Sequence, residues 1–437
     1  MTVAYPTHSD ALLNIKAAPY NAIGDGKHND RPAIQSALDE AAKKGGTVFM
    51  PAGIYRVDAV EEPGSRIFCL LIKSNVMLKG EGRGATTLFL DDNQPNETRI
   101  LTNYHYSAKE GDSNITFEDF SIDGNAAHQK AGGSFGIRCV FTQKVTHKRI
   151  LIKDIKGTPK VEGASFESYS SSNNDYTDCE ATTTVPGDTV TGSGFSVVYS
   201  TGIEYKGCQA SRSSSWQGFT SMESRLISYV NCHAYLNQER GFNSERSSEM
   251  QYINCIAGGR TTFHSEGFPA TPNASLGNKA QGFYVWKSHN VLINNCISIG
   301  NLWGIYDFES TNLRIISGVI TENNFGLGFE KTEDARSTRI SGAPIINANR
   351  MAGRVGELEF QTTSGPIGPP LLPASGVDFY NPYPFDASVY IYGGKVKGVS
   401  VQGQYMSGYS SGSIHLPAGG MMQIRYSKAP QWKWVIE

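Results

Sequence analysis

The chain has 437 residues, of which 47 are glycine and only 18% are charged, and its formal net charge is −2. Glycine therefore makes up about 11%, against roughly 7% in average proteins, and the charged fraction lies below the usual 25% or so. This composition excludes a charged, disordered chain and provides no basic surface for nucleic acid. It favours a β protein with many tight turns and short strands.

One amphipathic helix is predicted near the N-terminus, after an arm at residues 1–19. Asp30 is a suitable N-cap, and Pro32 falls in the first turn, where its missing N–H costs nothing. Apolar residues then recur at helical spacing, and Gly45-Gly46 ends the segment. The pattern predicts a capping helix at about residues 31–44.

From residue 75 to 353 the sequence repeats a two-strand unit. An Asn-Cys pair ends the first strand, and a Gly-aromatic or Gly-Ile pair opens the second. The opening glycines lie 22 or 23 residues apart, except for one interval of 41 that holds a Gly-, Pro-, Asn- and Ser-rich loop. Those glycines are Gly218, Gly241, Gly282, Gly304 and Gly326. This period, with short strands and no helices, predicts a β-solenoid, which we interpret as a parallel β-helix over residues 20–353.

The C-terminal part has a different pattern. Residues 354–375 include a Pro/Gly-rich run and are expected to form a linker. Three apolar-alternating segments follow, which predict a small antiparallel β domain at residues 376–437. No stretch reaches the roughly 18 apolar residues of a membrane span, and no signal peptide is visible.

The N-terminal segment resembles the signature of the pectate-lyase-like superfamily, whose fold is a right-handed parallel β-helix capped by one helix. The matching residues are Gly24-Asp25-Gly26, Asp30, Ala33-Ile34-Gln35, Ala37-Leu38, Gly45-Gly46-Thr47-Val48, Pro51-Ala52-Gly53 and Tyr55. The runs from Ile72 to Gly82 and from Ile122 to Asn125 resemble mannuronan C5-epimerase modules and phage tailspike depolymerases. The run from Leu416 to Trp434 resembles the terminal module of some phage tail proteins.

One departure bears on the activity that this resemblance implies. Alginate epimerases of this fold carry an Asp-Pro-His triplet, whereas the matching coil here reads Gly163-Ala164-Ser165-Phe166-Glu167-Ser168. Enzymes of this fold that act on acidic glycans often use Ca²⁺, but the sequence shows no calcium site, no zinc-ligand spacing and no cofactor motif.

Counting from each repeat glycine predicts which side chains point outward, because alternate residues of a strand face opposite sides. The predicted outward pairs include Ser165/Glu167, Asn243/Glu245, Tyr284/Trp286 and Tyr306/Phe308. Four aromatic side chains on adjacent coils form a platform on which sugar rings can stack, unless the long loop or another subunit covers them. We expect Tyr284, Trp286, Tyr306, Phe308, Lys287 and Asn243 to bind substrate.

Glu245 lies beside this platform and is the first candidate for catalysis. Hydrolysis of a glycosidic bond needs a second carboxyl group at about 5 Å or 6.5–9.5 Å, for which Glu223 and Glu266 are the candidates. Asp307 and Glu309 replace them if the strand phase slips by one residue. Elimination at a uronate needs instead a base and a cation, and Arg246 and His264 are candidates for these roles beside Lys287, Tyr284 and Tyr306.

Five of the seven cysteines, Cys179, Cys208, Cys232, Cys255 and Cys296, fall at or near one position of the repeat. Equivalent positions stack in a β-helix, so we expect an interior ladder of free thiols rather than disulfides or a metal site.

Three functions follow as hypotheses. The first is a polysaccharide depolymerase, a hydrolase (glycosidase) or a lyase, associated with a phage tail as a homotrimer and acting outside the cell. The second is a C5-epimerase or an alginate- or pectate-type lyase on uronate polymers. The third is a non-catalytic glycan receptor-binding rod.

Overall fold

The computed structural model describes residues 12–62, 66–158, 163–184, 192–214, 217–259, 277–342, 344–356, 358–360 and 364–437. The chain divides into two compact units: unit 1 is Met1–Asn243 with Phe263–Phe268, and unit 2 is Ser244–Thr262 with Pro269–Glu437. Within the described ranges, no helix has the length and apolarity needed to cross a membrane.

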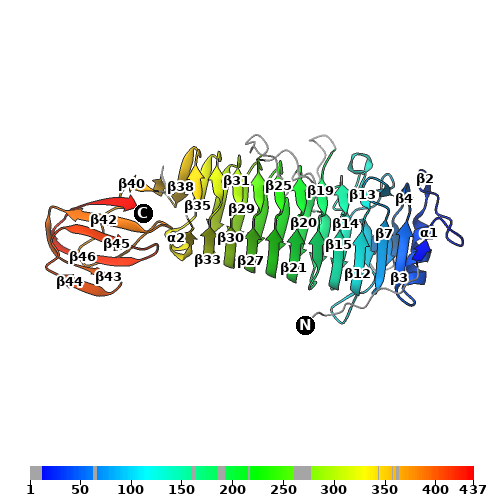
Figure 1. The fold of residues 1–437 in the computed structure, drawn as a ribbon, viewed down its shortest axis with the longest axis horizontal. Coiled ribbons are helices and arrows are strands. Elements are labelled where there is room, and N and C mark those ends of the chain that lie inside the picture. The colour runs from blue at the N-terminus through cyan, green and yellow to red at the C-terminus, as the bar shows by residue number, and fades with distance from the viewer. Residues whose placement is uncertain are drawn as a thin grey trace. The chain divides into compact units, whose positions relative to one another are not determined.

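The coils of unit 1 contribute strands to three parallel sheets, here called A, B and C (Figure 1). In the first described coil, helix α1 (Arg31–Ala41) follows the B strand and takes the place of a C strand. The A strands are β1 (Leu12–Asn14), β3 (Gly46–Met50), β7 (Val76–Gly80), β12 (Ser113–Glu118), β15 (Gln143–Lys148), β18 (Asp175–Thr177), β21 (Thr201–Lys206) and β24 (Arg225–Val230). The B strands are β2 (Asp25–Asn29), β4 (Gly53–Val57), β8 (Thr86–Leu90), β13 (Ser121–Asp123), β16 (Leu151–Lys153), β19 (Glu180–Thr182), β22 (Gln209–Ser211) and β25 (His233–Tyr235).

The C strands of unit 1 are β6 (Arg66–Ile72), β9 (Arg99–Asn103), β14 (Phe135–Val140), β17 (Ala164–Tyr169), β20 (Ser193–Val198) and β23 (Phe219–Met222). The short strand β5 (Val60–Glu62) pairs antiparallel with β6, and the 3-10 helix η1 (Ala126–His128) follows β13. A hairpin of β10 (Tyr106–Ser107) and β11 (Glu110–Gly111) projects between β9 and β12. Strand β26 (Phe242–Glu245) contains the boundary between the two units.

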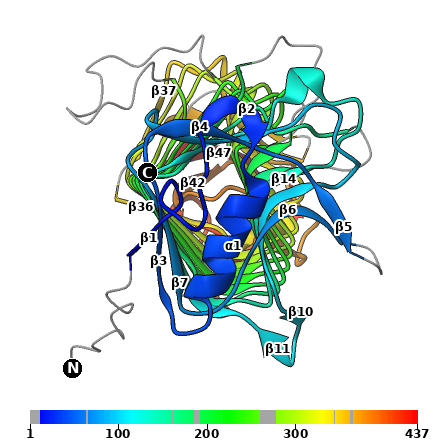
Figure 2. The same ribbon diagram turned by 90° about the vertical axis from the view of Figure 1, so that its right-hand side faces the viewer.

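Helix α1 (Arg31–Ala41) lies across the end of the unit 1 coils (Figure 2). It buries Ile34, Leu38 and two alanines. The side-chain amide of Gln35 both donates to and accepts from the backbone of Leu71, at 3.0 and 2.8 Å. The helix thus supplies hydrogen-bond partners to β6 beyond the residues that pair with β5, where the backbone groups of this edge would otherwise be unpaired.

Unit 2 has the same arrangement of A, B and C strands. Its A strands are β27 (Ser248–Ile253), β30 (His289–Asn294), β33 (Thr311–Ile316) and β36 (Arg339–Ser341), and its B strands are β28 (Ile256–Gly258), β31 (Ile297–Ile299), β34 (Val319–Thr321) and β37 (Ile345–Asn347). Its C strands are β29 (Gln281–Trp286), β32 (Trp303–Phe308), β35 (Phe325–Phe329) and β38 (Met351–Val355), with β39 (Leu358–Phe360) antiparallel to β38. Helix α2 (Thr332–Ser337) follows β35.

The C-terminal part of unit 2 forms two antiparallel four-stranded sheets. One contains β40 (Gly365–Ile367), β47 (Gln431–Ile436), β42 (Ala387–Tyr392) and β45 (Gly412–Leu416), and the other contains β41 (Asp378–Tyr380), β46 (Met421–Lys428), β43 (Lys395–Val401) and β44 (Gln404–Ser407). The expected linker therefore contributes β39 and β40, and Gly365 pairs with Ile436.

The coil interior is built from stacked identical positions. In unit 1 the rings of Phe166, Phe195, Phe219 and Phe242 stack with centroids 4.7–5.0 Å apart. All seven cysteines are buried free thiols, as expected. The thiols of Cys208 and Cys232 donate to backbone carbonyls of the preceding coil at 3.5 and 3.6 Å. The predicted right-handed parallel β-helix class is confirmed by these parallel sheets and by the relatives described below.

Candidate functional site

The predicted aromatic platform lies on the outward face of β29 and β32 in unit 2. Tyr284 pairs in register with Tyr306, and Trp286 pairs with Phe308. The tyrosine rings stack with centroids 5.9 Å apart, and the Trp286 and Phe308 rings meet edge to face at 6.5 Å. We call these four residues the aromatic shelf.

Gly328 leaves room for the Tyr306 ring of the aromatic shelf. Gly328 is the register partner of Tyr306 on β35, and a Cβ at Gly328 would overlap the rings of Tyr306 and Trp303. Tyr306 therefore lies over β35, where its hydroxyl donates to Glu330. Burial, followed by the neighbouring Glu330 carboxylate, raises the pKa of Tyr306 to about 12.

Charged side chains surround the shelf in pairs. Arg246 forms an ion pair with Glu245 at 2.8 Å, and its guanidinium lies 5.2 Å from the Trp286 ring. Lys287 lies 5.6 Å from the same ring and 3.4 Å from Glu309, which also pairs with Lys331. The carboxylates of Glu245 and Glu309 are thus held by cations, and the hydrogen bond from Lys331 lowers the pKa of Glu309.

The structure gathers only part of the predicted site. Glu245, Arg246, Lys287 and the aromatic shelf belong to unit 2, whereas Glu223 and the buried Asn243 belong to unit 1. His264 and Glu266 lie outside the described residues. The strand phase does not slip, so Asp307 faces the coil interior, where burial raises its pKa to about 7.

Unit 1 holds a second cluster, which the sequence interpretation missed. Arg138 on β14 and Glu167 on β17 are register partners, point outward and form an ion pair. Although they lie on the outer face, Glu167 is only 7% exposed and the neighbouring Arg99 only 8%. We call Arg99, Arg138 and Glu167 the arginine–glutamate cluster.

The register shifts the expected outward pair on this coil by one alternate position. Glu167 points outward as expected, but Glu167 and Tyr169, not Ser165 and Glu167, align with Ser196 and Val198 on the next coil. Ser165 takes the place that glycine holds in other coils, and it is 5% exposed. Gly163 lies two residues before the position of the repeat glycine, and the phenylalanine at the next inward position, Phe166, marks the phase of this coil.

Burial dominates the electrostatics of the cluster. It raises the pKa of Glu167 in spite of the opposing effects of Arg138 and Arg99. Burial also lowers the pKa of Arg99 and raises that of Tyr106, a tyrosine from the hairpin. A carboxyl group with a raised pKa between two cations is suited to proton transfer beside an anionic group.

Aromatic rings enclose the cluster. The guanidinium of Arg138 lies 4.3 Å from the Phe135 ring and 5.7 Å from the Tyr169 ring. Tyr169 meets the half-exposed ring of Tyr199 edge to face at 5.6 Å. These rings offer a sugar an apolar surface directly beside the arginines. Over the described ranges, no three His, Cys, Asp or Glu side chains group as metal ligands.

Residues 14–243 match the family described as "Rhamnogalacturonase A/epimerase, pectate lyase-like". The chain belongs to this family. The resemblance expected from the N-terminal signature is thereby confirmed, and the matched residues include the arginine–glutamate cluster.

Three relatives illustrate the similarity. Over 116 residues the chain is 42% identical to mannuronan C5-epimerase AlgE1 of Azotobacter vinelandii, covering 26% of this chain and 8% of that protein. The A-module of mannuronan C-5 epimerase AlgE4 of the same organism superposes with a TM-score of 0.60 at 23% identity, covering 77% of this chain and 89% of that one. The Dettilon tailspike protein gp208 gives a TM-score of 0.51 at 11% identity, covering 97% and 94%. The two structures share the fold, and the chain spans less than a tenth of the length of AlgE1.

Proposed function

We propose that this protein is a polysaccharide-cleaving lyase that acts on a uronate-containing glycan at the arginine–glutamate cluster. One observation carries the proposal: the outward-facing carboxyl of Glu167 is buried, has a raised pKa and is paired with Arg138. The similarity of part of the chain to a protein named as a mannuronan epimerase supports a uronate substrate.

The arginines would bind the carboxylate of the sugar. A guanidinium matches a carboxylate in a bidentate geometry, and Arg138 and Arg99 both lie beside Glu167 in the cluster. Neutralising the uronate carboxylate makes the proton at C5 easier to remove. Tyr169 and Tyr199 would support the sugar ring from the side.

The reaction then needs a base and a proton donor. In the proposed step Glu167 takes the C5 proton, the C5–H electron pair forms the C4–C5 double bond, and the C4–O bond breaks. The leaving oxygen receives a proton from a tyrosine hydroxyl, for which Tyr106 and Tyr169 are the neighbours. Returning the proton to the opposite face of C5, without cleavage, would be epimerisation.

Hydrolysis is less well supported at this cluster. On the flanking C strands the register partners of Glu167 are Arg138 and Ser196, neither of which is a carboxylate. A hydrolase needs two carboxyl groups about 5–9.5 Å apart. The expected glycosidase activity at Glu245 remains a second proposal, tested by Glu245→Gln in the same assays.

The test incubates the purified chain with alginate, pectate and bacterial capsules. Reducing ends together with ultraviolet absorbance of unsaturated uronate indicate a lyase, and exchange of the C5 proton without cleavage indicates an epimerase. We expect Glu167→Gln to lower kcat at least about 100-fold, as loss of a general base does. Glu180→Gln is the matched control, because Glu180 also has a pKa raised by burial and an arginine partner, Arg83, but lies on β19. Equal activity of both variants would refute the assignment.

The aromatic shelf is proposed as a glycan-binding surface in unit 2. Trp286→Ala should weaken glycan binding, and binding without any turnover would favour the non-catalytic receptor-binding rod instead. Because such a glycan lies outside cells, we propose that the protein acts there, associated with a phage tail as a homotrimer. Native mass measurement tests the trimer.

A further inference from the structure

A ladder of hydroxyl groups lines the turn that precedes the A strands. In unit 1 the Oγ atoms of Ser171, Ser200 and Ser224 each accept the backbone N–H of the ladder residue one coil earlier, at 2.9–3.1 Å. In unit 2 Ser288 and Ser310 do the same, both at 3.1 Å. A single hydroxyl oxygen is therefore enough to accept this backbone N–H in these coils.

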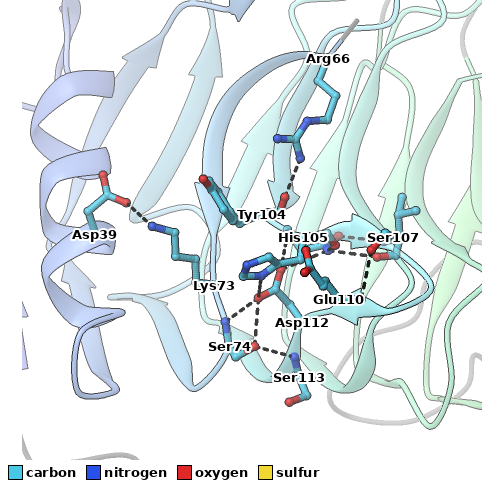
Figure 3. A network of polar contacts seen from close by, with 12 residues as sticks. Asp39, Arg66, Lys73, Ser74, Tyr104, His105, Ser107, Glu110, Asp112 and Ser113 are labelled. Atoms are coloured by element: carbon cyan, nitrogen blue, oxygen red, sulfur yellow. Dashed lines mark hydrogen bonds and ion pairs between the residues drawn. The ribbon is translucent and has the colours of Figure 1, made fainter. Parts of the chain in front are cut away.

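Asp112 occupies the ladder position in the coil that contains the hairpin. Its carboxylate accepts the N–H of Ser74 at 2.9 Å, as the hydroxyls do, and its side chain is fully buried. It accepts in addition the Ser74 hydroxyl at 2.9 Å, the His105 N–H at 2.6 Å and the Nδ1 of the His105 ring at 3.0 Å (Figure 3). Burying a carboxylate costs free energy unless its oxygens are bonded, so the ladder alone does not account for an aspartate here.

The extra bonds hold the segment that carries Tyr106. His105 directly precedes Tyr106, and both its backbone and its ring are bonded to Asp112. The hydroxyl of Tyr106 lies 2.7 Å from Oγ1 of Thr102, which itself donates to the carbonyl of Arg138 at 2.7 Å. Tyr106 thus connects the hairpin with the arginine–glutamate cluster.

Two further contacts fix the same segment. The guanidinium of Arg66 lies 5.0 Å from the Tyr106 ring and donates to the carbonyl of Tyr104 at 2.6 Å. At the other end of the hairpin, a Cβ on Gly111 would overlap the carbonyl oxygen of Phe141 in the next coil. The hairpin therefore lies tightly against its neighbours, with Asp112 at its root.

We infer that Asp112 and His105 are positioning residues that hold Tyr106 against the arginine–glutamate cluster. This inference rests on the proposed function, and it adds residues outside the C strands to the reacting site. Asp112 acts through Tyr106 rather than on the substrate. Replacing Asp112 by the residue that the ladder uses elsewhere should leave the coil folded and release the hairpin segment.

Asp112→Ser tests this, with Tyr106→Phe and the double variant. We expect Asp112→Ser to lower kcat/KM about tenfold or more, since small misplacements at a reacting site have effects of this size or larger. The double variant should be no worse than Tyr106→Phe alone, because residues that act through one another are not additive. Ser200→Ala, which removes a ladder hydroxyl elsewhere, should leave kcat/KM unchanged.

Hydrogen exchange provides a readout that does not depend on activity. In Asp112→Ser the amides of residues 104–111 should exchange faster, while the amide of Ser74 stays protected through the new hydroxyl. Unchanged protection of residues 104–111, or additive losses in the double variant, would overturn the inference. A wild-type chain that turns over no substrate, with the expected exchange pattern, would instead refute the proposed lyase reaction and leave the hold of Asp112 on the hairpin intact.

Discussion

Gly328 lies directly beneath the ring of Tyr306, its register partner on the neighbouring strand. The pair decides the form of the aromatic shelf, because any side chain at Gly328 would push Tyr306 and Trp303 away from β35.

Gly328→Ala should therefore destabilise unit 2 and weaken glycan binding together. Overpacking of this kind costs about 1–3 kcal/mol, which urea unfolding would measure, and titration with oligosaccharides would measure binding. Gly368→Ala is the control, because a Cβ at Gly368 meets nothing within 4 Å. A Gly328→Ala variant as stable as the wild type would contradict the packing described for Tyr306.

The buried carboxyl of Asp307 should make stability depend on pH. Its pKa is raised from 3.8 to about 7, by burial first and then by Asp334. Folding therefore favours the protonated form, and stability should fall as pH rises from about 4 to about 7, by up to about 4 kcal/mol, then level off. Unfolding free energies measured at pH 5 and pH 8 should differ in the wild type. In Asp307→Asn that difference should largely disappear, and a variant that keeps the full wild-type difference would assign the effect to another group.

The Arg138–Glu167 pair should be costly to break. Arg138→Met or Glu167→Leu alone leaves a charge of the cluster without its partner and should cost about 3–5 kcal/mol, whereas the two changes together should cost less than the sum of the single changes. Denaturant unfolding of the two single variants and the double variant measures the free energies of unfolding for this double-mutant cycle. Additive losses would mean that the two side chains do not interact as described.

The cysteine thiols should be unreactive in the native protein. All seven are buried as free thiols, so a thiol reagent should react slowly with native protein and with seven groups after denaturation. Fewer than seven reactive groups under non-reducing denaturing conditions would indicate a disulfide, and rapid native labelling would indicate an exposed thiol.

The repeat could be predicted because its signals are local. The spacing of Gly282, Gly304 and Gly326 and the Asn-Cys pairs reflect fixed turns: Asn231, Asn254 and Asn295 each adopt a left-handed backbone conformation before the cysteine that follows. Asparagine accepts that conformation more readily than most residues, so the pattern survives in the sequence.

The arginine–glutamate cluster could not be predicted in the same way. Ser165 replaces the glycine that marks the phase, and the burial of Glu167 depends on neighbours such as Arg138 that lie about one coil away in the sequence. The hairpin interrupts the repeat, so Tyr106 carried no periodic signal, and Asp112 stands at a ladder position that serine occupies in other coils. The shelf was found from the sequence because its four aromatics keep the repeat phase.

The hydroxyl ladder also imposes a direction on assembly. Each accepting oxygen belongs to the coil that comes later in the chain, as Ser200 Oγ does for the amide of Ser171. The ladder amide of one coil therefore has its protein acceptor only once the following coil is in place. A chain truncated after any of these coils would leave that N–H bonded to water.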